Sequence, residues 1–443
     1  MARRRVQLPP VKIGVLGLGT VGCGTLNVLA RNRDEIARRA GRNIEVVAAS
    51  ARDLAKARPI DTSGIRLTTD PFSVVDDPSI EIVVELIGGT DPARELVMRA
   101  LDNGKDVVTA NKALIALHGN EVFARAQAQG LTVAFEAAVA GGIPVIKTLR
   151  EALAGNTVEW LAGIINGTCN FMLTAMSERS ADFAEVLAEA QALGYAEADP
   201  SFDIDGVDAA HKLTILASIA FGIPLQFGKI HIEGIRDLTL DDVRYAEALG
   251  YRIKHLAFAK RAPTGIELRV HPTLVPRRVM LAHVNGVMNG ILIRGDAVGP
   301  MLLSGAGAGA EPTASSVVAD IVDVVRALTV DPNNRVPHLA FRADSLSEAP
   351  ILPMADVESA YYLRLSAADQ PGVLADITRI LADLAISIEA IRQPEAADGE
   401  ATVPIIILTH RVGEAAMNAA VARIAKLPGI GANITRIRME EFA

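Results

Sequence analysis

The sequence predicts an α/β protein in which a parallel sheet comes first and smaller mixed domains follow. Over residues 11–142, short apolar strands alternate with helical segments, as in a parallel sheet with helical crossovers. Residues 143–311 are more mixed and contain long helical runs, which indicates a separate α+β domain. A proline-rich hinge at 350–356 precedes residues 357–443, where strands and helices alternate again on a smaller scale.

Composition supports this division and excludes some classes of function. The 443 residues correspond to about three domains. The formal net charge of -8, without a block of lysines or arginines, predicts no nucleic-acid binding. The basic start at residues 3–5 is followed by no apolar run, so we expect no signal peptide. Residues 160–177 are the nearest candidate for a membrane span, but asparagines and a glycine interrupt them, and we expect no membrane association.

The cysteines and histidines predict a cytoplasmic protein without a zinc site. Cys23 and Cys169 are the only cysteines, which favours a reducing compartment over a disulfide framework. No cluster of histidines and cysteines has the spacing of zinc ligands. Cys169 and His211 lie in apolar context, and we expect both in the core or behind a site.

The strands of the first domain are predicted by apolar runs, each followed by turn residues or by helical periodicity. A helix is expected directly after the first strand, at 20–40. Another helix, at 313–328, is expected to return to the first domain within 312–340. The expected strands, with their turns, span 11–19, 44–50, 80–87, 106–110 and 131–139, and further helices span 182–193 and 206–220.

The C-terminal residues predict a ferredoxin-like βαββαβ unit, which is a small sheet with helices on one face. Its elements follow one another at short spacing after the hinge. The expected strands span 361–367, 386–393 and 402–410, with a last strand near 432–439; one helix spans 373–385 and a turn spans 394–399.

The segment "GLGTVG" at 17–22 satisfies the dinucleotide-binding fingerprint with Gly17, Gly19 and Gly22. It follows a strand and opens a helix that begins with Thr20 and Val21, which is the context that a Rossmann-type domain requires. The first glycine permits a tight turn, the second lets the backbone approach a pyrophosphate, and the third lets helix and strand pack closely. The alternative is a glycine-rich turn in an unrelated α/β protein.

The end of the second strand bears on the choice of cofactor. NAD-selective folds place an acid there, but this strand ends at Ser50 and Arg52 follows. A guanidinium binds a phosphate through paired hydrogen bonds, so the sequence favours NADP, with NAD possible. The alternative is that Arg52 is a solvated loop residue.

Several longer motifs together carry a family resemblance. The chain resembles homoserine dehydrogenase over nearly its whole length, and residues 357–443 resemble an ACT domain, a fold that often binds an amino-acid effector. No kinase-length segment precedes the fingerprint, so the resemblance is to the monofunctional form. The matching stretches are "GLGTVG", "ELIGG", "TANKALIA", "FEAAVAGGIP", "GIINGTCNF", "LGYAEADPSFDIDGVDAAHKLTILA" and "GAGAGAEPTAS".

The resemblance implies the interconversion of L-homoserine and L-aspartate 4-semialdehyde with NAD(P), in threonine and methionine biosynthesis. It implies that Glu197 and Asp208 contact homoserine, that Asp203 supports them, and that Lys212 is the general acid and base. Asp208 and Lys212 are four residues apart, which places them on one helix face. The alternative for this stretch is a helix capped by Asp205 with a lysine reaching for solvent.

The resemblance also assigns residues around the cofactor. Lys112, just past a strand of the parallel sheet, would face both nicotinamide and substrate, because ligands bind at the carboxyl ends of such strands. Its alternative is a surface lysine at a helix start. Glu311 departs from the family pattern, where an apolar residue is expected. Further cofactor contacts are implied at Thr90, Gly194 and Gly309.

A monovalent cation, sodium or potassium, is implied for "FEAAVAGGIP" at 135–144. Its ligands would be Glu136 and the backbone oxygens of Val139, Gly141 and Ile143, which are oxygen donors that suit a hard ion. The alternative is a structural turn between domains.

The C-terminal loop "DQPG" is where the ACT resemblance implies an effector, with Asp369 and Gly372 as contacts and threonine as the expected ligand. Its alternative is a plain turn in a dimerising module. A homodimer or homotetramer is expected. Two other functions stay open: a dehydrogenase of a related amino or hydroxy acid, and an amino-acid sensor without catalysis. Lys112 and Lys212 speak against the sensor.

Overall fold

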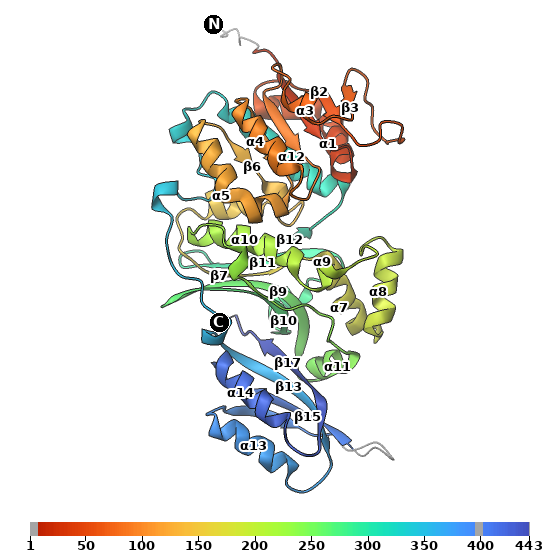
Figure 1. The fold of residues 1–443 in the computed structure, drawn as a ribbon, viewed down its shortest axis with the longest axis vertical. Helices are drawn as coiled ribbons and strands as arrows, with labels where there is room; N and C mark the ends of the chain where they lie inside the picture. The colour runs from red at the N-terminus through yellow and green to blue at the C-terminus, as the bar shows by residue number, and fades with distance from the viewer. Residues whose placement is uncertain (1–7, 395–401, 443) are drawn as a thin grey trace. The chain divides into compact units, whose positions relative to one another are not determined.

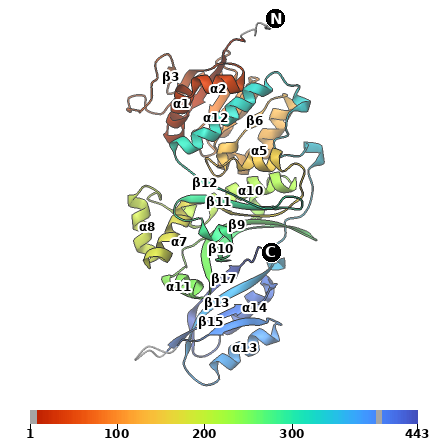
Figure 2. The same ribbon diagram turned by 180° about the vertical axis from the view of Figure 1, so that it is seen from behind.

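The structure is a computed structural model that describes residues 8–394 and 402–442, so most of the expected turn at 394–399 lies outside the described residues. The chain divides into two compact units, and each is described by itself. Figures 1 and 2 show the helices and strands along the chain. The predicted domain boundaries stay a prediction, because each unit combines segments from distant parts of the chain. Unit 1 comprises Met1–Glu159, His211–Gly228 and Arg294–Glu348; unit 2 comprises Trp160–Ala210, Lys229–Ile293 and Ala349–Ala443.

Unit 1 contains the predicted Rossmann-type sheet, in which every pair of neighbouring strands is parallel. The order β3-β2-β1-β4-β5-β6 reverses direction at β1, so the carboxyl ends of β1 and β4 flank the crevice where such sheets bind ligands. The strands are β1 (Val11–Leu16), β2 (Ile44–Ser50), β3 (Arg66–Thr68), β4 (Ile82–Glu85), β5 (Asp106–Thr109) and β6 (Val133–Ala134).

Three details of unit 1 differ from the sequence prediction. The helix expected at 20–40 is two helices, because the backbone leaves helical geometry at Asn32. The strand expected at 131–139 is only β6, since a 3-10 turn begins at Glu136. The helix expected at 313–328 begins earlier, at Ala310, and ends at Ala327 near its expected end, and Pro332 then begins a short 3-10 turn within the expected return segment 312–340.

Helices cover both faces of the unit 1 sheet. Side chains of α1, α2 and α12 form one buried core with the strands, and Figure 2 shows these three helices together. The other helices include α4 and α5, which pack on each other. The bounds are α1 (Thr20–Arg31), α2 (Arg33–Ala40), α3 (Phe72–Val75), α4 (Ala93–Asp102), α5 (Lys112–Ala128), α6 (Val145–Lys147) and α12 (Ala310–Ala327); β12 (Gly299–Ala306) precedes α12.

Unit 2 is built on a mixed sheet with the order β11-β7-β9-β10-β17-β13-β15-β14. Its centre is a long antiparallel pair, β9 with β10, which the sequence analysis did not predict. The C-terminal strand β17 pairs parallel with β10 and antiparallel with β13, so one sheet runs into the C-terminal domain. The bounds are β7 (Val158–Ile164), β8 (His231–Ile232), β9 (Tyr251–Ala262), β10 (Gly265–Pro276), β11 (Met288–Gly295), β13 (Glu358–Ala368), β14 (Ile388–Arg392), β15 (Thr402–Thr409), β16 (Val412–Gly413) and β17 (Ile430–Met439).

The predicted βαββαβ unit is confirmed at the C-terminus. Helices α13 and α14 cover one face of its sheet (Figure 1), and a buried apolar core lies between them and the strands. No helix in the described part of the chain is long and apolar enough to cross a membrane. The helices of unit 2 are α7 (Gly167–Arg179), α8 (Phe183–Ala192), α9 (Ser201–Ile204), α11 (Leu240–Ala248), α13 (Val373–Asp383) and α14 (Glu414–Ile424); α10 (Val207–Phe221) begins in unit 2 and continues in unit 1.

Candidate active site

The fingerprint turn between β1 and α1 has the geometry that a dinucleotide requires. Gly17 has φ +101°, and a Cβ there would lie 2.8 Å from the carbonyl oxygen of Leu86. A Cβ on Gly22 would clash with the carbonyl oxygen of Gly17, whereas at Gly19 it would meet open space. Gly19 is therefore the position where a pyrophosphate can approach the backbone, beside the free N–H groups of the α1 N-terminus. The residues present fit a bound dinucleotide.

A buried carboxylate that the sequence analysis missed shapes the loop after β4. Glu85 is fully buried, and its carboxylate accepts hydrogen bonds from the backbone N–H groups of Ile87 (2.8 Å) and Gly88 (3.1 Å). It also accepts one from the hydroxyl of Thr109 at the end of β5 (2.6 Å). The loop that leads to Thr90 is thereby fixed at the edge of the sheet where cofactors bind. An acid closing an apolar strand was the available signal.

Lys112 is the first residue of α5 and is half-buried. Asn111 caps this helix, because its side chain accepts a hydrogen bond from the backbone N–H of Leu114 (3.0 Å). The same side chain donates to the carbonyl of Gly89 (2.6 Å). Lys112 therefore stands at the carboxyl end of β5, on a helix start that is tied to the loop after β4.

The loop after β2 is held beside the fingerprint by Arg58. Its Nε donates to the carbonyl of Leu18 (3.1 Å), inside the glycine turn, and another guanidinium nitrogen donates to the carbonyl of Asp53 (2.6 Å). Arg52 lies on this loop with an exposed side chain. The structure thus adds Arg58 as a residue that positions the loop, which the search for a charge directly after β2 did not find.

The loop expected to hold a cation begins with Glu136, which is only 2% exposed. Its carboxylate accepts hydrogen bonds from the backbone N–H groups of Ile146 and Lys147, both at 2.8 Å. The residues between, Ala140 and Gly141, have φ of +56° and +51°, which turns the chain sharply. The carbonyl of Gly141 accepts from the hydroxyl of Ser316 (2.7 Å).

The carboxylate of Glu136 and the backbone carbonyls of its loop fit a cation, because each of these oxygens keeps a further lone pair. The Val139 carbonyl directly follows the 3-10 turn, and the Ile143 carbonyl accepts from the N–H of Val145 (2.8 Å). Burial raises the pKa of Glu136, although the hydrogen bonds from Lys147 and Ile146 oppose this. A buried carboxylate with a raised pKa gains free energy from a nearby positive charge.

Asp320 on α12 completes this cluster and was not predicted. It is 2% exposed and accepts a hydrogen bond from the backbone N–H of Glu136 (2.7 Å). Burial, followed by the charge of Glu136, raises the pKa of Asp320 to about 8. Within the described residues neither acid forms an ion pair.

The glycine loop before α12 ends at Gly309, which has φ +122° and stands at the N-cap position. Glu311 follows in the first turn and pairs with Arg31 at the end of α1 (2.7 Å). Both side chains are more than half exposed, so the unexpected acid joins two helices at the surface and disturbs no apolar contact.

Two of the predicted substrate acids are brought together in unit 2. Asn166 donates one side-chain hydrogen bond to Asp203 (2.7 Å) and one to Asp208 (2.9 Å). Its oxygen accepts from the backbone N–H of Cys169 (2.8 Å), so the same residue caps α7. Thr168 donates to Asp203 (3.3 Å) and to the carbonyl of Tyr195 (2.7 Å). Asn166 and Thr168 were not among the predicted site residues.

The helix-capping alternative for Asp205 is wrong. Asp205 stands at the end of α9 and pairs with Arg236. Gly206, with φ +89°, separates it from α10. A glycine is needed there because the chain turns through the left-handed region between the two helices.

Helix α10 carries Asp208, which is 2% exposed, and Lys212, which is 9% exposed, one turn apart. His211 is buried and its ring lies 4.5 Å from that of Phe227, in agreement with a core role. Glu197 and Gly194 lie on the exposed loop between α8 and α9, and the backbone carbonyl of Glu197 accepts from Gln191 (3.1 Å).

The loop expected to bind an effector is exposed. Gly372, with φ +98°, stands at the N-cap position of α13, and Asp369 accepts a hydrogen bond from the side chain of Gln393 (3.4 Å). The described residues include no cluster of three or more acids, histidines or cysteines that could hold a metal.

The comparisons with known proteins cover the same segments. The homoserine dehydrogenase family profile matches residues 144–322, and the NAD-binding domain of homoserine dehydrogenase matches residues 17–136. An ACT domain matches residues 361–429. These matches confirm the family resemblance and the nicotinamide-binding fold.

Relatives and solved structures match nearly the whole chain. The homoserine dehydrogenase of Pseudomonas aeruginosa is 61% identical over 98% of this chain and 100% of its own length, and that of Neisseria gonorrhoeae is 52% identical over the same shares. The crystal structure of a homoserine dehydrogenase from Thiobacillus denitrificans has a TM-score of 0.94 at 62% identity, covering 99% of this chain and 100% of that one. A hyperthermophilic archaeal homoserine dehydrogenase in complex with NADPH has a TM-score of 0.60 at 27% identity, covering 71% and 97%.

Proposed function

Because the chain belongs to the homoserine dehydrogenase family, we propose a mechanism in which residues of α10 bind the substrate and move its proton. The enzyme interconverts L-homoserine and L-aspartate 4-semialdehyde with a nicotinamide cofactor. The reaction lies on the route to threonine and methionine. A nicotinamide cofactor held at the fingerprint turn would supply hydride transfer to and from the carbon that bears the hydroxyl in homoserine.

Lys212 is the proposed general acid and base. In the oxidation its amine takes the proton of the substrate hydroxyl, and in the reduction its ammonium returns that proton to the carbonyl oxygen. Its place one turn after Asp208 supports this role, because both side chains leave the same face of α10. Lys112, at the carboxyl end of β5, is proposed to orient the hydroxyl.

The acids supply the recognition of an amino acid. Asp208, with Asp203 joined to it through Asn166, is proposed to bind the substrate ammonium. Glu197 is proposed as a further contact from its loop. An amide that donates to both carboxylates holds them at a fixed separation. The two carboxylates are therefore already positioned before the substrate binds.

We propose NADP as the preferred form of the cofactor and a monovalent cation as a second ligand. The exposed Arg52, on a loop that Arg58 fixes beside the fingerprint, supports NADP. The buried Glu136 and the carbonyls of its loop support the cation. Thr90, Gly194 and Gly309 are proposed as further cofactor contacts.

The regulatory and assembly claims are proposals as well. Threonine is the proposed effector, at the exposed turn of Asp369 and Gly372, where no side chain caps the N-terminus of α13. A homodimer or homotetramer is the proposed assembly. The cytoplasm is the proposed location, where reduced thiols such as Cys23 and Cys169 are stable.

One assay tests the mechanism. Purified protein is mixed with homoserine and NADP+ or NAD+, and the absorbance of the reduced nicotinamide is followed with and without threonine. We expect Lys212→Ala to lower kcat by about 10²- to 10⁴-fold while cofactor binding survives. Near wild-type turnover in Lys212→Ala would remove this lysine from the mechanism.

The matched control is Lys105→Met. Lys105 is also a buried lysine, but it stands at the opposite end of β5 from Lys112 and donates to the carbonyls of Asp77 (2.6 Å) and Ile80 (2.7 Å). Its loss is expected to lower stability and leave the turnover of folded enzyme intact.

A higher kcat/KM for NAD+ than for NADP+ in the wild-type enzyme would contradict the proposed preference for NADP.

A further inference from the structure

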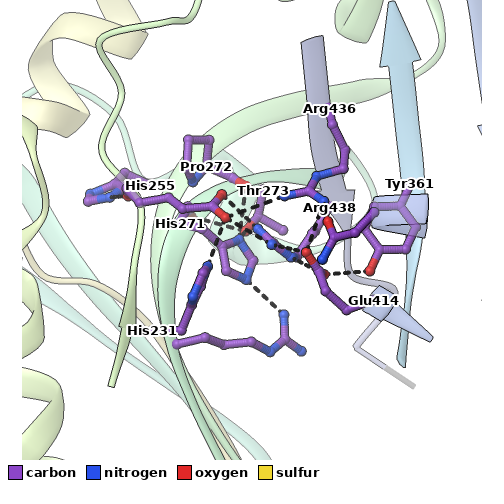
Figure 3. Close-up of polar contacts among 12 residues, drawn as sticks. His231, His255, His271, Pro272, Thr273, Tyr361, Glu414, Arg436 and Arg438 are labelled. Atoms are coloured by element: carbon purple, nitrogen blue, oxygen red, sulfur yellow. Dashed lines mark hydrogen bonds and ion pairs between the residues drawn. The ribbon is translucent and has the colours of Figure 1, made fainter. Parts of the chain in front are cut away.

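An ion network joins the C-terminal domain to the rest of unit 2; it is buried at Arg438 and Glu414 and partly exposed at Glu233. Arg438 on β17 is 1% exposed, and its guanidinium donates to both oxygens of Glu233 (2.7 and 2.9 Å). On its other edge it donates to both oxygens of Glu414 at the start of α14 (2.9 and 2.6 Å). Figure 3 shows Arg438, Glu414 and Tyr361 next to one another, with Arg436 beside them.

The charges of this network balance. Arg436 lies 3.1 Å from Glu414 and 3.7 Å from Glu233, so two guanidinium groups face two carboxylates. Tyr361 donates to Glu414 (2.6 Å). Burial alone would raise the pKa of Glu233, but hydrogen bonds from His231 and Arg438 outweigh it, and the pKa lies well below its usual range.

Glu233 comes from the other side of this junction. It follows β8, and its backbone N–H donates to the carbonyl of Val270 on β10 (2.8 Å). Its backbone carbonyl accepts from Nε2 of the buried His255 on β9 (3.0 Å). Because a carbonyl only accepts, this contact fixes the proton of His255 on Nε2.

The residues after Glu233 contact residues 204–206, which lie between the two substrate acids Asp203 and Asp208. A Cβ on Gly234 would clash with the carbonyl oxygen of Ile204, so the two backbones are in close contact. The N–H of Ile235 donates to that same carbonyl (2.8 Å), and Arg236 pairs with Asp205.

His255 packs against residues 204–206 from a second side. A Cβ on Gly206 would lie 3.2 Å from the His255 ring. Residues 204–206 are therefore confined between the segment 233–236 and His255. Residues 205 and 206 are the whole connection between α9, which carries Asp203, and α10, which carries Asp208.

We propose that Glu233–Arg236 is a positioning segment, anchored by Arg438 of the C-terminal domain, that sets the place of Asp208 relative to Asp203 and so the affinity for homoserine. The inference rests on the proposed function, in which these acids bind the substrate ammonium. It assigns Glu233 and Arg438 no contact with substrate. It also gives β17 a direct mechanical connection to the substrate acids, through which a ligand of the C-terminal domain would change homoserine binding.

The test compares Michaelis constants in the full-length enzyme. Glu233→Gln keeps the shape of the side chain and weakens its attachment to Arg438. We expect it to raise KM for homoserine by at least about 5-fold, the low end of typical couplings between sites, with KM for the cofactor unchanged. A merely destabilised enzyme would lose active fraction and would not change one Michaelis constant alone.

A matched control is Asp242→Asn. Asp242 is also buried and also holds the C-terminal domain, because it pairs with Arg364 on β13 (2.6 Å). Its hydrogen bonds go to Thr239, Tyr362 and Arg364, none of which lies in 203–208 or 233–236. We expect both Michaelis constants to stay at their wild-type values.

A double-mutant cycle with Asp208→Asn decides whether Glu233 acts through that acid. If it does, Glu233→Gln adds nothing to the homoserine KM of Asp208→Asn, whereas independent effects would add. Additive effects, or an unchanged homoserine KM in folded Glu233→Gln, would overturn the positioning role alone. A wild-type enzyme that does not oxidise homoserine, or a wild-type KM in Asp208→Asn, would overturn the proposed function and this inference with it.

Should Glu233→Gln fail to fold, Gly234→Ala tests the other end of the segment. Its added methyl must push Ile204 away, and the same rise in homoserine KM is expected. An unchanged KM in folded Gly234→Ala would overturn the proposal equally.

Discussion

Each unit holds a pair of acids that is largely shielded from solvent, and the two pairs are stabilised in different ways. Glu136, Asp320 and Glu414 are buried, whereas the side chain of Glu233 is 31% exposed. In unit 2, Glu233 and Glu414 share two arginines, and the pKa of each lies below its usual value although burial opposes this. In unit 1, Glu136 and Asp320 accept hydrogen bonds from backbone N–H groups, and burial raises the pKa of both. Hydrogen bonds from N–H groups satisfy oxygen lone pairs but supply no whole charge.

The difference indicates what each pair is for. A buried carboxylate whose counter-charge belongs to the same chain needs no further ligand to balance its charge. Such a pair fixes the geometry of the elements that carry it. A buried carboxylate held mainly by dipoles is stabilised further by an added cation. The unit 2 pair therefore fits a mechanical junction, and the unit 1 pair fits a ligand site.

The largest expected effect comes from removing the shared counter-charge in unit 2. Arg438→Met leaves the buried Glu414 with Arg436 alone, at 3.1 Å, and the partly exposed Glu233 with His231 and the more distant Arg436. We expect a loss of about 3–5 kcal/mol in the free energy of unfolding, as for other buried ion pairs that lose one partner. Urea unfolding followed by circular dichroism measures it. Arg423→Met, which breaks an exposed pair with Asp383, is the control, and equal losses in both variants would contradict the distinction.

The sequence predicted the parts of this comparison unevenly. Glu136 was predicted, because its motif resembles a family cation loop. Asp320 was not, because it lies on a helix 184 residues away and only folding brings it to the N–H of Glu136. Local periodicity predicted the parallel sheet and the βαββαβ unit, since each element there alternates or repeats over a short window.

The same limit explains the rest of the site. Asn166 looked like an interruption of an apolar run, and its role depends on two carboxylates that approach it from α9 and from α10. The long strands β9 and β10 were missed because most of their side chains are buried on both faces, which removes the alternation that identifies a strand. Arg58 was missed because its contact with Leu18 spans 40 residues.

A smaller effect is expected from the acid side of the unit 2 pair, and it depends on pH. The folded pKa of Glu414 lies below the ordinary value of 4.5, because Arg438 and Tyr361 favour its ionised form against burial. Its contribution to stability is therefore present above pH 4.5 and is lost as the pH falls through the folded pKa. We expect Glu414→Gln to be less stable than wild type at neutral pH, by about 1.4 kcal/mol for each pKa unit of the shift.

This difference between wild type and Glu414→Gln should close as the pH falls below 4.5, which thermal unfolding across a pH series measures. Asp383→Asn, in the exposed pair with Arg423, is the control, and its stability should follow wild type throughout. A gap that stays constant into acid would show that the lost packing, and not the charge, causes the difference.

The smallest expected effect is the response of the unit 1 pair to a monovalent cation. A ligand that binds only the folded state stabilises it by RT ln(1 + [L]/Kd), about 1.4 kcal/mol at ten times the dissociation constant. We expect potassium or sodium chloride to raise the unfolding temperature of wild type above that in choline chloride at equal ionic strength. Glu136→Gln should lose this difference, because the amide offers one oxygen and no charge. Glu233→Gln should keep it, because the arginines of unit 2 already neutralise the remaining acid. The same cation response in wild type and Glu136→Gln would place the ion elsewhere or reduce it to a general salt effect, and the two acid pairs would then differ in chemistry without differing in use.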